Sequence, residues 1–244
     1  MHPILFTSGG LRVTSYAVFM LLAFTAAYFI RKAEVRRLGY AKEHGHQWIG
    51  VGALLGAVLG TKIGMILFEP PEGLERLIAQ AFSLDFSGKT IVGALVVSFI
   101  SVEITKKIVG IEQPTGDGFA LSFLVATGIG RIGCFLNGCC YGSESHGPIA
   151  VYMVGATRHP VQLYESALVL ALACVVVAIR KRPRPRGRLW RMTLLAYAVV
   201  RFTMEFFRGD PVRHVGPLTA VQVVCIAAAA LLLFAMRPQK QVAV

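Results

Sequence analysis

The chain alternates between long apolar segments and short polar stretches. Each apolar segment is bounded by polar or turn-forming residues, and its length is close to the roughly 20 residues that an α-helix needs to cross a bilayer. We therefore predict seven transmembrane helices, near residues 13–30, 48–68, 90–105, 118–133, 161–179, 189–207 and 217–236. The expected fold class is an all-α polytopic membrane protein, with residues 1–244 forming a single integral membrane domain.

The overall composition is typical of a membrane protein. Of the 244 residues, 55% are hydrophobic and only 16% are charged, whereas soluble domains average about 25% charged residues. The mean hydropathy is +0.62. The composition therefore excludes a soluble globular domain, and the abundance of apolar residues also excludes an intrinsically disordered chain.

The net charge of +12 is distributed unequally between the two sides of the predicted membrane. Because loops alternate sides, one side collects residues 31–47, 106–117, 180–188 and 237–244. With Arg191 included, that side carries 16 Lys and Arg residues against 6 on the opposite side. The positive-inside rule then places the N-terminus outside and the C-terminus in the cytoplasm. The basic run at 180–188 is expected to lie near anionic headgroups and not to bind nucleic acid, since no folded basic domain surrounds it.

Small residues predict how one of these helices packs. Gly52, Gly56, Gly60 and Gly64 recur every four residues in the second apolar segment and so share one helix face. Such a face allows two helix backbones to approach closely. We expect this stripe to be a packing surface with no catalytic part.

Charged residues within membrane segments are costly and usually functional. On the predicted topology, five of them fall in the outer halves of their helices: Lys62, Arg131, Glu165, Arg201 and Glu205. Their convergence predicts a polar cavity that opens to the outer leaflet or to outer water. Two structural alternatives stay open, because Lys62 can snorkel outward along its long stem and Arg201 with Glu205 can form an ion pair that locks two helices.

Arg131 is the strongest candidate for ligand binding. It lies in the glycine-rich stretch 128–133, and glycine lets a ligand or a neighbouring backbone come close. The guanidinium group presents a fork of donors that matches phosphate oxygens. A phospholipid headgroup is the phosphate available at this depth, so we expect a phospholipid site.

Residues 130–142 read GRIGCFLNGCCYG and resemble the signature loop of prolipoprotein diacylglyceryl transferases, GRxGNFxNxExxG. Further segments resemble the same family in the same order: the N-terminal His-Pro, the region of Tyr16, and residues 60–64, 159–165 and 201–210. The resemblance implies a multi-pass protein of the bacterial inner membrane. It also implies that phosphatidylglycerol and a preprolipoprotein are the substrates. The diacylglyceryl group would pass to the lipobox cysteine, with release of glycerol phosphate.

The resemblance also implies roles for individual residues. Arg131 and Arg201 are expected to stabilise the charge that develops on the departing phosphate. The base that accepts the proton of the cysteine thiol is expected among Glu205, His159 and Glu165. The other expected substrate-binding residues are Tyr16, Lys62, Asn137, Gly142, Gln162, Tyr164 and Arg208. Since the substrate supplies the nucleophile, no protein nucleophile, metal or cofactor is expected.

Three positions depart from the family pattern. Cys134 replaces the first Asn of the signature, Cys139 replaces its Glu, and Val92 stands where the family usually carries a His. Lys89 is a candidate to replace that His. Together with Cys140, these two cysteines lie on the predicted outer side, where the three could form a structural disulfide, remain buried thiols, bind a metal or act in redox chemistry. The alternative function is therefore a phospholipid-dependent or thiol-redox membrane enzyme of the same fold.

Overall fold

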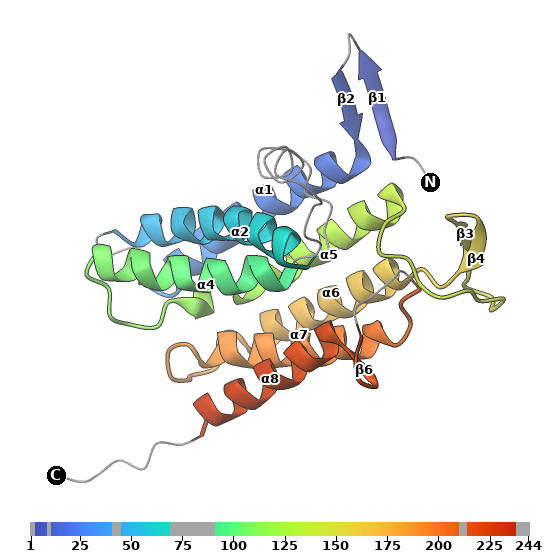
Figure 1. Cartoon of the computed structure of the whole chain (residues 1–244). Coiled ribbons are helices and arrows are strands. Elements are labelled where there is room, and N and C mark those ends of the chain that lie inside the picture. Colours follow the sequence, from blue (N-terminus) through green and yellow to red (C-terminus); the bar gives the residue numbers. More distant parts are fainter. Residues whose placement is uncertain (1–2, 9–10, 41–44, 69–90, 210–213, 238–244) are drawn as a thin grey trace. The chain divides into compact units, whose positions relative to one another are not determined.

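The computed structural model describes residues 3–8, 11–40, 45–68, 91–209 and 214–237. In these ranges each predicted apolar segment forms a helix, so the helical nature of all seven segments is confirmed, whereas their crossing of a membrane stays a prediction. They are labelled in Figure 1 as α1 (Ser15–Arg37), α2 (His46–Phe68), α4 (Ile91–Ile108), α5 (Ala120–Asn137), α6 (Val161–Ile179), α7 (Arg188–Glu205) and α8 (Ala220–Ala235).

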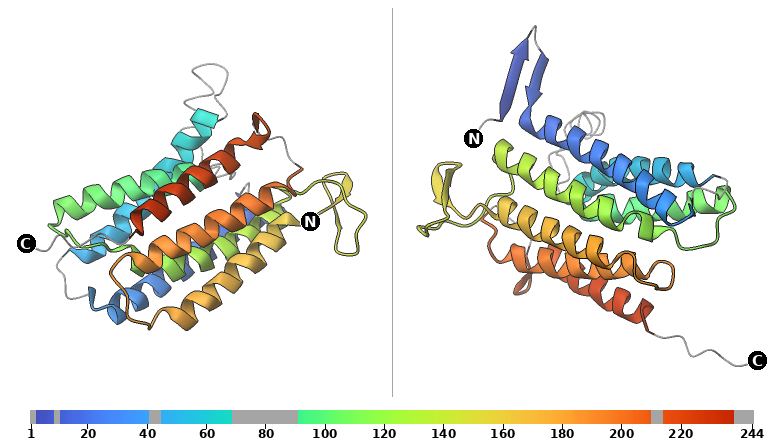
Figure 2. Two further views of the ribbon diagram at one scale, coloured as in Figure 1. Left: turned by 90° about the horizontal axis from the view of Figure 1, so that it is seen from below. Right: turned by 180° about the vertical axis from the view of Figure 1, so that it is seen from behind.

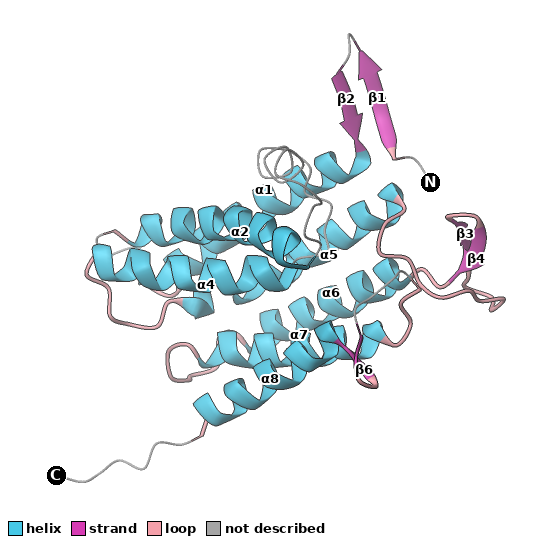
Figure 3. Cartoon of the chain, viewed as in Figure 1, coloured by secondary structure: helices cyan, strands magenta, loops and turns pink. Residues whose placement is uncertain are grey.

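Among the described residues, three short antiparallel hairpins lie outside the helices and were not predicted. They pair β1 (Ile4–Ser8) with β2 (Leu11–Thr14), β3 (Val151–Met153) with β4 (Ala156–Arg158), and β5 (His214–Val215) with β6 (Leu218–Thr219). Figure 3 shows the strands in magenta beside a fold that is otherwise helical. Because each strand has at most five residues, the hairpins leave the all-α class unchanged.

The residues group into two compact units. The first unit contains Met1–Glu34 and Pro114–Val244, and the second contains Val35–Gln113. Each unit has its own helix packing, and the prediction that the chain is one domain stays a prediction.

The second unit is built on the packing of α2 against α4. The predicted glycine stripe faces α4: a Cβ atom built on Gly56 would lie 2.6 Å from the Cα atom of Ser98, and one built on Gly60 would overlap the backbone of Gly93. Ser101 also donates a hydrogen bond of 2.7 Å to the carbonyl of Gly52. The expectation that the stripe is a packing surface is confirmed for the residues the structure describes.

In the first unit α5 packs on α6, α6 on α7, and α7 on α8. Figure 2 shows these helices following one another side by side. The start of α7 is held by Asp117, from the 3-10 helix η2 (Gly116–Gly118). Its carboxylate accepts hydrogen bonds from the backbone N–H groups of Gly187 at 2.8 Å and Trp190 at 2.9 Å. These bonds satisfy N–H groups that a helix N-terminus leaves without partners.

Two helices in the described part of the chain, α5 and α6, are long and apolar enough to cross a membrane. The apolar helix α8 is shorter, at 16 residues. Large apolar side chains are exposed on α6 and α8, among them Val175 and Phe234, as expected for surfaces that face lipid. The protein is therefore mostly helical, with helices suited to a membrane.

Candidate active site

A buried ion pair joins α5 to α6. Nη2 of Arg131 lies 3.0 Å from Oε1 of Glu165, and the two residues are only 7% and 1% exposed. The helices lie close together near this pair, where Ser166 donates a 2.9 Å hydrogen bond to the carbonyl of Gly128. Two of the residues predicted to converge are thus in direct contact, from segments more than 30 positions apart.

Tyr197 extends this contact to α7. Its hydroxyl donates to Oε1 of Glu165 at 3.3 Å, and the tyrosine itself is buried. Tyr197 was not among the residues predicted for the site. The available signal was its position four residues before Arg201, which places both on one face of α7.

A second buried ion pair lies within α7. Nη2 of Arg201 is 2.8 Å from Oε2 of Glu205, one helical turn along the chain. The predicted ion pair therefore exists, but it lies within one helix and does not lock two helices together. It also does not use all the polar atoms of the two side chains. Within the described residues, Nε and Nη1 of Arg201 and Oε1 of Glu205 are buried without a hydrogen-bond partner. Unsatisfied buried groups are costly, so these atoms indicate a place for a polar ligand.

The first turn of α6 holds the loop that follows α5. Nε2 of Gln162 donates a 2.7 Å hydrogen bond to the carbonyl of Cys139. Gln162 is almost fully buried, and its Oε1 is a further buried atom for which the described residues offer no partner. Because Gln162 precedes Glu165 by three residues, the loop and the Arg131 ion pair are attached to the same turn of helix.

The same loop also crosses the end of α7. The backbone N–H of Ser143 donates to the carbonyl of Phe207 at 2.8 Å, and that of Gly209 donates to Tyr141 at 3.1 Å. Glycine is needed at position 209, since a Cβ atom there would overlap the carbonyl of Gly142. This pairing brings Arg208 beside Gly142.

His159 lies at the same crossing. Its carbonyl accepts a hydrogen bond from the N–H of Gly142 at 3.1 Å, and its own N–H donates to Ser143 at 3.0 Å. The ring Nδ1 is 3.2 Å from the hydroxyl of Tyr164. The structure therefore groups His159, Tyr164, Gly142 and Arg208 around the loop.

The other predicted site residues have different positions. Tyr16, near the start of α1, lies within electrostatic range of Arg131, and Asn137 is the last residue of α5. Lys62 lies on α2, in the second unit, so its part in the site stays a prediction. Lys89 lies outside the described residues, and Val92 lies in the first turn of α4.

Comparison with known proteins agrees with the resemblance seen in the sequence. A family model described as prolipoprotein diacylglyceryl transferase matches residues 3–237, nearly the whole chain. The chain belongs to the prolipoprotein diacylglyceryl transferase family. The family prediction drawn from the signature loop and the accompanying motifs is therefore confirmed.

Curated relatives of this transferase family match over most of their length. All three of the following are named phosphatidylglycerol–prolipoprotein diacylglyceryl transferase. The protein of Clostridium tetani (strain Massachusetts / E88) is 30% identical over 240 residues, which cover 93% of each chain. That of Nitratidesulfovibrio vulgaris (strain DP4) is 32% identical, covering 98% of this chain and 94% of the relative. That of Pseudoalteromonas translucida (strain TAC 125) is 34% identical, covering 85% and 80%.

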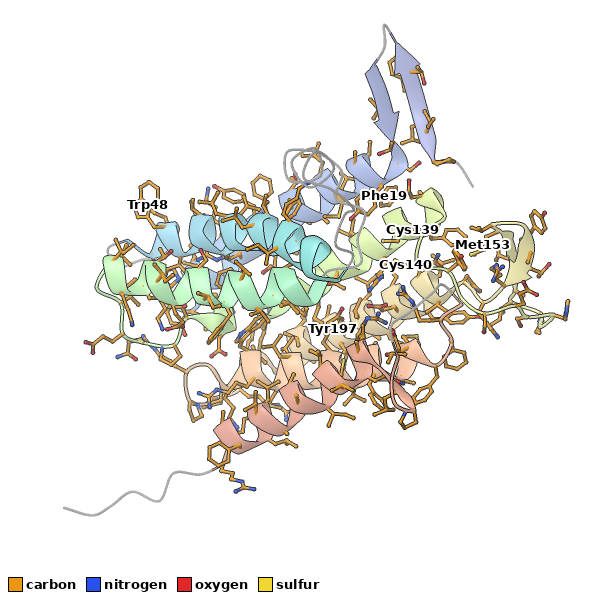
Figure 4. All side chains as sticks on the ribbon, in the orientation of Figure 1. Phe19, Trp48, Cys139, Cys140, Met153 and Tyr197 are labelled. Carbon is orange, nitrogen blue, oxygen red and sulfur yellow. The ribbon has the colours of Figure 1, made fainter. Side chains whose placement is uncertain are left out.

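The cysteines that replace two residues of the transferase signature lie together. The Sγ atoms of Cys134, Cys139 and Cys140 all lie within 4.8 Å of one another, and the three thiols are free. Figure 4 labels Cys139 and Cys140 beside the end of α5. Hydrogen bonds with the other two thiols lower the pKa of Cys140 well below its ordinary value, against the effect of burial, and the charges of Arg131 and Arg208 act in the same direction.

Proposed function

We propose that this protein transfers the diacylglyceryl group of phosphatidylglycerol to the lipobox cysteine of a prolipoprotein and releases glycerol phosphate. The observation that carries this proposal is the pair of buried guanidinium groups on adjoining helices. Arg131 pairs with Glu165, which also accepts a hydrogen bond from Tyr197. Arg201 lies four residues after Tyr197 on α7 and has two buried N–H positions without partners among the described residues.

In this reaction the thiolate attacks the glycerol carbon that carries the phosphodiester. A C–S bond forms, the C–O bond breaks, and the electron pair leaves on the phosphate oxygen. Nε and Nη1 of Arg201 are free to donate to phosphate oxygens, where charge-assisted hydrogen bonds are strong. Arg131 is held in place by Glu165 and stabilises the same developing charge, because fixed donors in a buried site need no reorganisation.

The acceptor thiol must lose its proton, and the surroundings of the three candidate bases differ. Glu165 already accepts from Arg131 and Tyr197 through Oε1. His159 has Nδ1 next to the Tyr164 hydroxyl. Glu205 keeps Oε1 buried without a partner in the described part of the structure, so this oxygen is the best placed of these groups to take a proton.

The remaining predicted residues are proposed to bind the substrates. Gly142 and Arg208 lie side by side where the loop crosses the end of α7, next to His159 and Tyr164. This arrangement supports a role in holding the headgroup or the lipobox peptide. The full set of proposed binding residues is Tyr16, Lys62, Asn137, Gly142, Gln162, Tyr164, Glu165 and Arg208.

We further propose that the protein spans the bacterial inner membrane seven times, with its N-terminus outside and its C-terminus in the cytoplasm. Two observations support this topology. The helices coincide with the seven apolar segments, and the larger share of Lys and Arg residues falls on the loops assigned to the cytoplasm. In this topology the signature loop faces outward, toward an exported prolipoprotein.

The direct test incubates the purified protein in detergent with phosphatidylglycerol and a lipobox peptide. Mass spectrometry of the peptide is expected to find a diacylglyceryl thioether on its cysteine, and no product when the cysteine is replaced by serine. The Arg131→Lys variant tests the site. It should insert into the membrane and purify in detergent like the wild-type protein, but it should form no product. Absence of the thioether with the wild-type protein, under conditions where lipid remains bound, would contradict the proposal.

A further inference from the structure

The three cysteines after α5 form a compact thiol cluster, defined here as Cys134, Cys139 and Cys140. Their Sγ atoms lie within 4.8 Å of one another. Cys134 and Cys140 are each 7% exposed, whereas Cys139 is half-buried. A disulfide uses two sulfur atoms, but here three converge, and all three are free thiols. This arrangement suits a metal ion better than a single disulfide.

The backbone after α5 is bent so that the three thiols meet. Gly138 ends the helix in the left-handed conformation with φ of 76°, and its N–H bonds back to Cys134 and Phe135. Cys140 also has a positive φ, of 58°, which a residue with a side chain rarely adopts. The N–H of Cys139 bonds to the carbonyl of Cys134 at 3.2 Å, and Gln162 holds the carbonyl of Cys139. The cluster is therefore fixed by hydrogen bonds from two helices.

The spacing of the sulfur atoms fits a zinc ion. Zinc binds thiolates at about 2.3 Å, so sulfur atoms in a tetrahedral site are about 3.8 Å apart. The present separations reach this value after shifts of at most roughly 1 Å, which side-chain rotation of the half-buried Cys139 can supply. Thiolates select soft ions such as zinc over magnesium or calcium.

Three protein ligands leave the fourth tetrahedral position free. Closed structural zinc sites have four protein ligands, whereas catalytic sites have three and bind water or substrate in the fourth position. In the part of the chain that the structure describes, no fourth Cys, His, Asp or Glu joins the cluster. The charge of a zinc-bound cluster also suits its surroundings. Three thiolates and one Zn²⁺ ion carry a net charge of one negative unit, and the positively charged Arg131 and Arg208 lie within electrostatic range of Cys140.

The cluster adjoins the proposed phosphate site. Cys134 follows Arg131 by three residues on α5, so both lie on one helix face. Cys139 is bonded to Gln162, one turn before the Glu165 that pairs with Arg131. A thiol bound at the fourth position would therefore lie beside the arginine side chains proposed to bind the phosphate.

We propose that Cys134, Cys139 and Cys140 bind one Zn²⁺ ion whose fourth ligand is the acceptor thiol of the prolipoprotein. This inference rests on the proposed function, since it assigns the thiol of that reaction. A thiol bound to a metal ion is deprotonated, and its proton passes to Glu205, the base proposed above. The sulfur then attacks the glycerol carbon, forming the C–S bond as the C–O bond to phosphate breaks. The thioether product carries no negative charge on sulfur, so it leaves the metal.

The site also accounts for the departures from the family signature. Cys134 and Cys139 occupy the positions of the signature Asn and Glu, and Val92 stands in place of the usual His. A metal ion that deprotonates the thiol makes a strong protein base unnecessary. The three replacements are then parts of one alternative mechanism for forming the thiolate. This proposal departs from the expectation from sequence that no metal is needed.

The test measures metal binding and thiol binding separately from turnover. The protein, purified under reducing conditions, is expected to contain about one zinc ion per chain by elemental mass spectrometry. After exchange with Co²⁺, its absorption spectrum should show tetrahedral thiolate coordination. Addition of the lipobox peptide should change that spectrum, while the serine version of the peptide should not.

Two variants complete the test. Cys139→Ser removes a direct ligand. It should therefore lower zinc affinity by more than the roughly 100-fold that loss of an outer-shell contact can cost. The control Cys174→Ser, on α6 and remote in sequence from the cluster, should leave zinc affinity unchanged. The comparison between the lipobox peptide and its serine version uses the wild-type protein, so it does not depend on how the variants fold. Absence of bound zinc, a disulfide within the cluster, or full transfer by chelator-treated protein overturns the metal proposal. Zinc and peptide binding without thioether product would instead contradict the proposed function and leave the metal site standing.

Discussion

The Arg201→Lys substitution isolates the contribution of the guanidinium fork. Nε and Nη1 of Arg201 are buried without partners in the described structure, and each can form a charge-assisted hydrogen bond of about 1.5–3 kcal/mol with a phosphate oxygen. Lysine keeps the charge and can replace one of the two bonds, but it lacks the fork. The net loss is therefore about 1.5–3 kcal/mol of transition-state stabilisation, which corresponds to a decrease in kcat/KM of about 10- to 150-fold.

The assay is diacylglyceryl transfer from phosphatidylglycerol in mixed micelles to a fluorescent lipobox peptide, with kcat and KM determined separately. Arg188→Lys serves as the matched control, because Arg188 is exposed at the opposite end of the same helix, and it should retain wild-type kcat/KM. If Arg201→Lys folds and stays within twofold of the wild type, the two N–H groups do not bind the phosphate and the proposed role of Arg201 is wrong.

Three further substitutions test the framework of the site by thermal and denaturant unfolding in detergent. Glu165→Gln should destabilise the protein by about 3–5 kcal/mol because it leaves the buried Arg131 without its ion partner, whereas Glu144→Gln, in an exposed pair with Arg158, should cost about 0–1 kcal/mol; equal effects would refute the importance of burial. Gly209→Ala should cost about 1–3 kcal/mol because its Cβ atom overlaps Gly142. Gly147→Ala, which meets only Ser145 Oγ at 3.5 Å, should be neutral. Asp117→Ala should cost about 1–3 kcal/mol through loss of two hydrogen bonds at the start of α7, and a change below 0.5 kcal/mol (roughly the scatter of neutral surface changes) would show that water replaces them.

The helices could be predicted from sequence because long apolar runs are the strongest local signal in a membrane protein. Their ends were less certain. The first run was predicted to end near residue 30, but α1 continues to Arg37, since Arg, Lys, Ala and Glu in 31–37 are good helix formers. The hairpins were missed because strands of two to five residues carry too little pattern to be distinguished from loops.

The candidate site could be predicted only in part. Charge within an apolar helix singled out Arg131, Glu165, Arg201 and Glu205, since such charges are costly wherever the helix lies. Tyr197 gave no such signal, because an aromatic residue in an apolar helix is ordinary until its hydroxyl is seen to bond with Glu165.

The thiol cluster shows a second limit. The spacing of Cys134, Cys139 and Cys140 left a disulfide, a metal site and a redox centre open. Their proximity depends on the left-handed conformations of Gly138 and Cys140 and on the Gln162 hydrogen bond from another helix. Neither feature follows from the spacing of cysteines along the chain.

The most direct measurement for the central claim is an experimental structure of the protein with phosphatidylglycerol bound. We expect the phosphate to lie between α5 and α7, with its oxygens about 2.7–3.2 Å from guanidinium nitrogens of both Arg131 and Arg201. A phosphate bound elsewhere, with Arg201 still paired only to Glu205, would contradict the claim that these two arginines grip the phosphodiester.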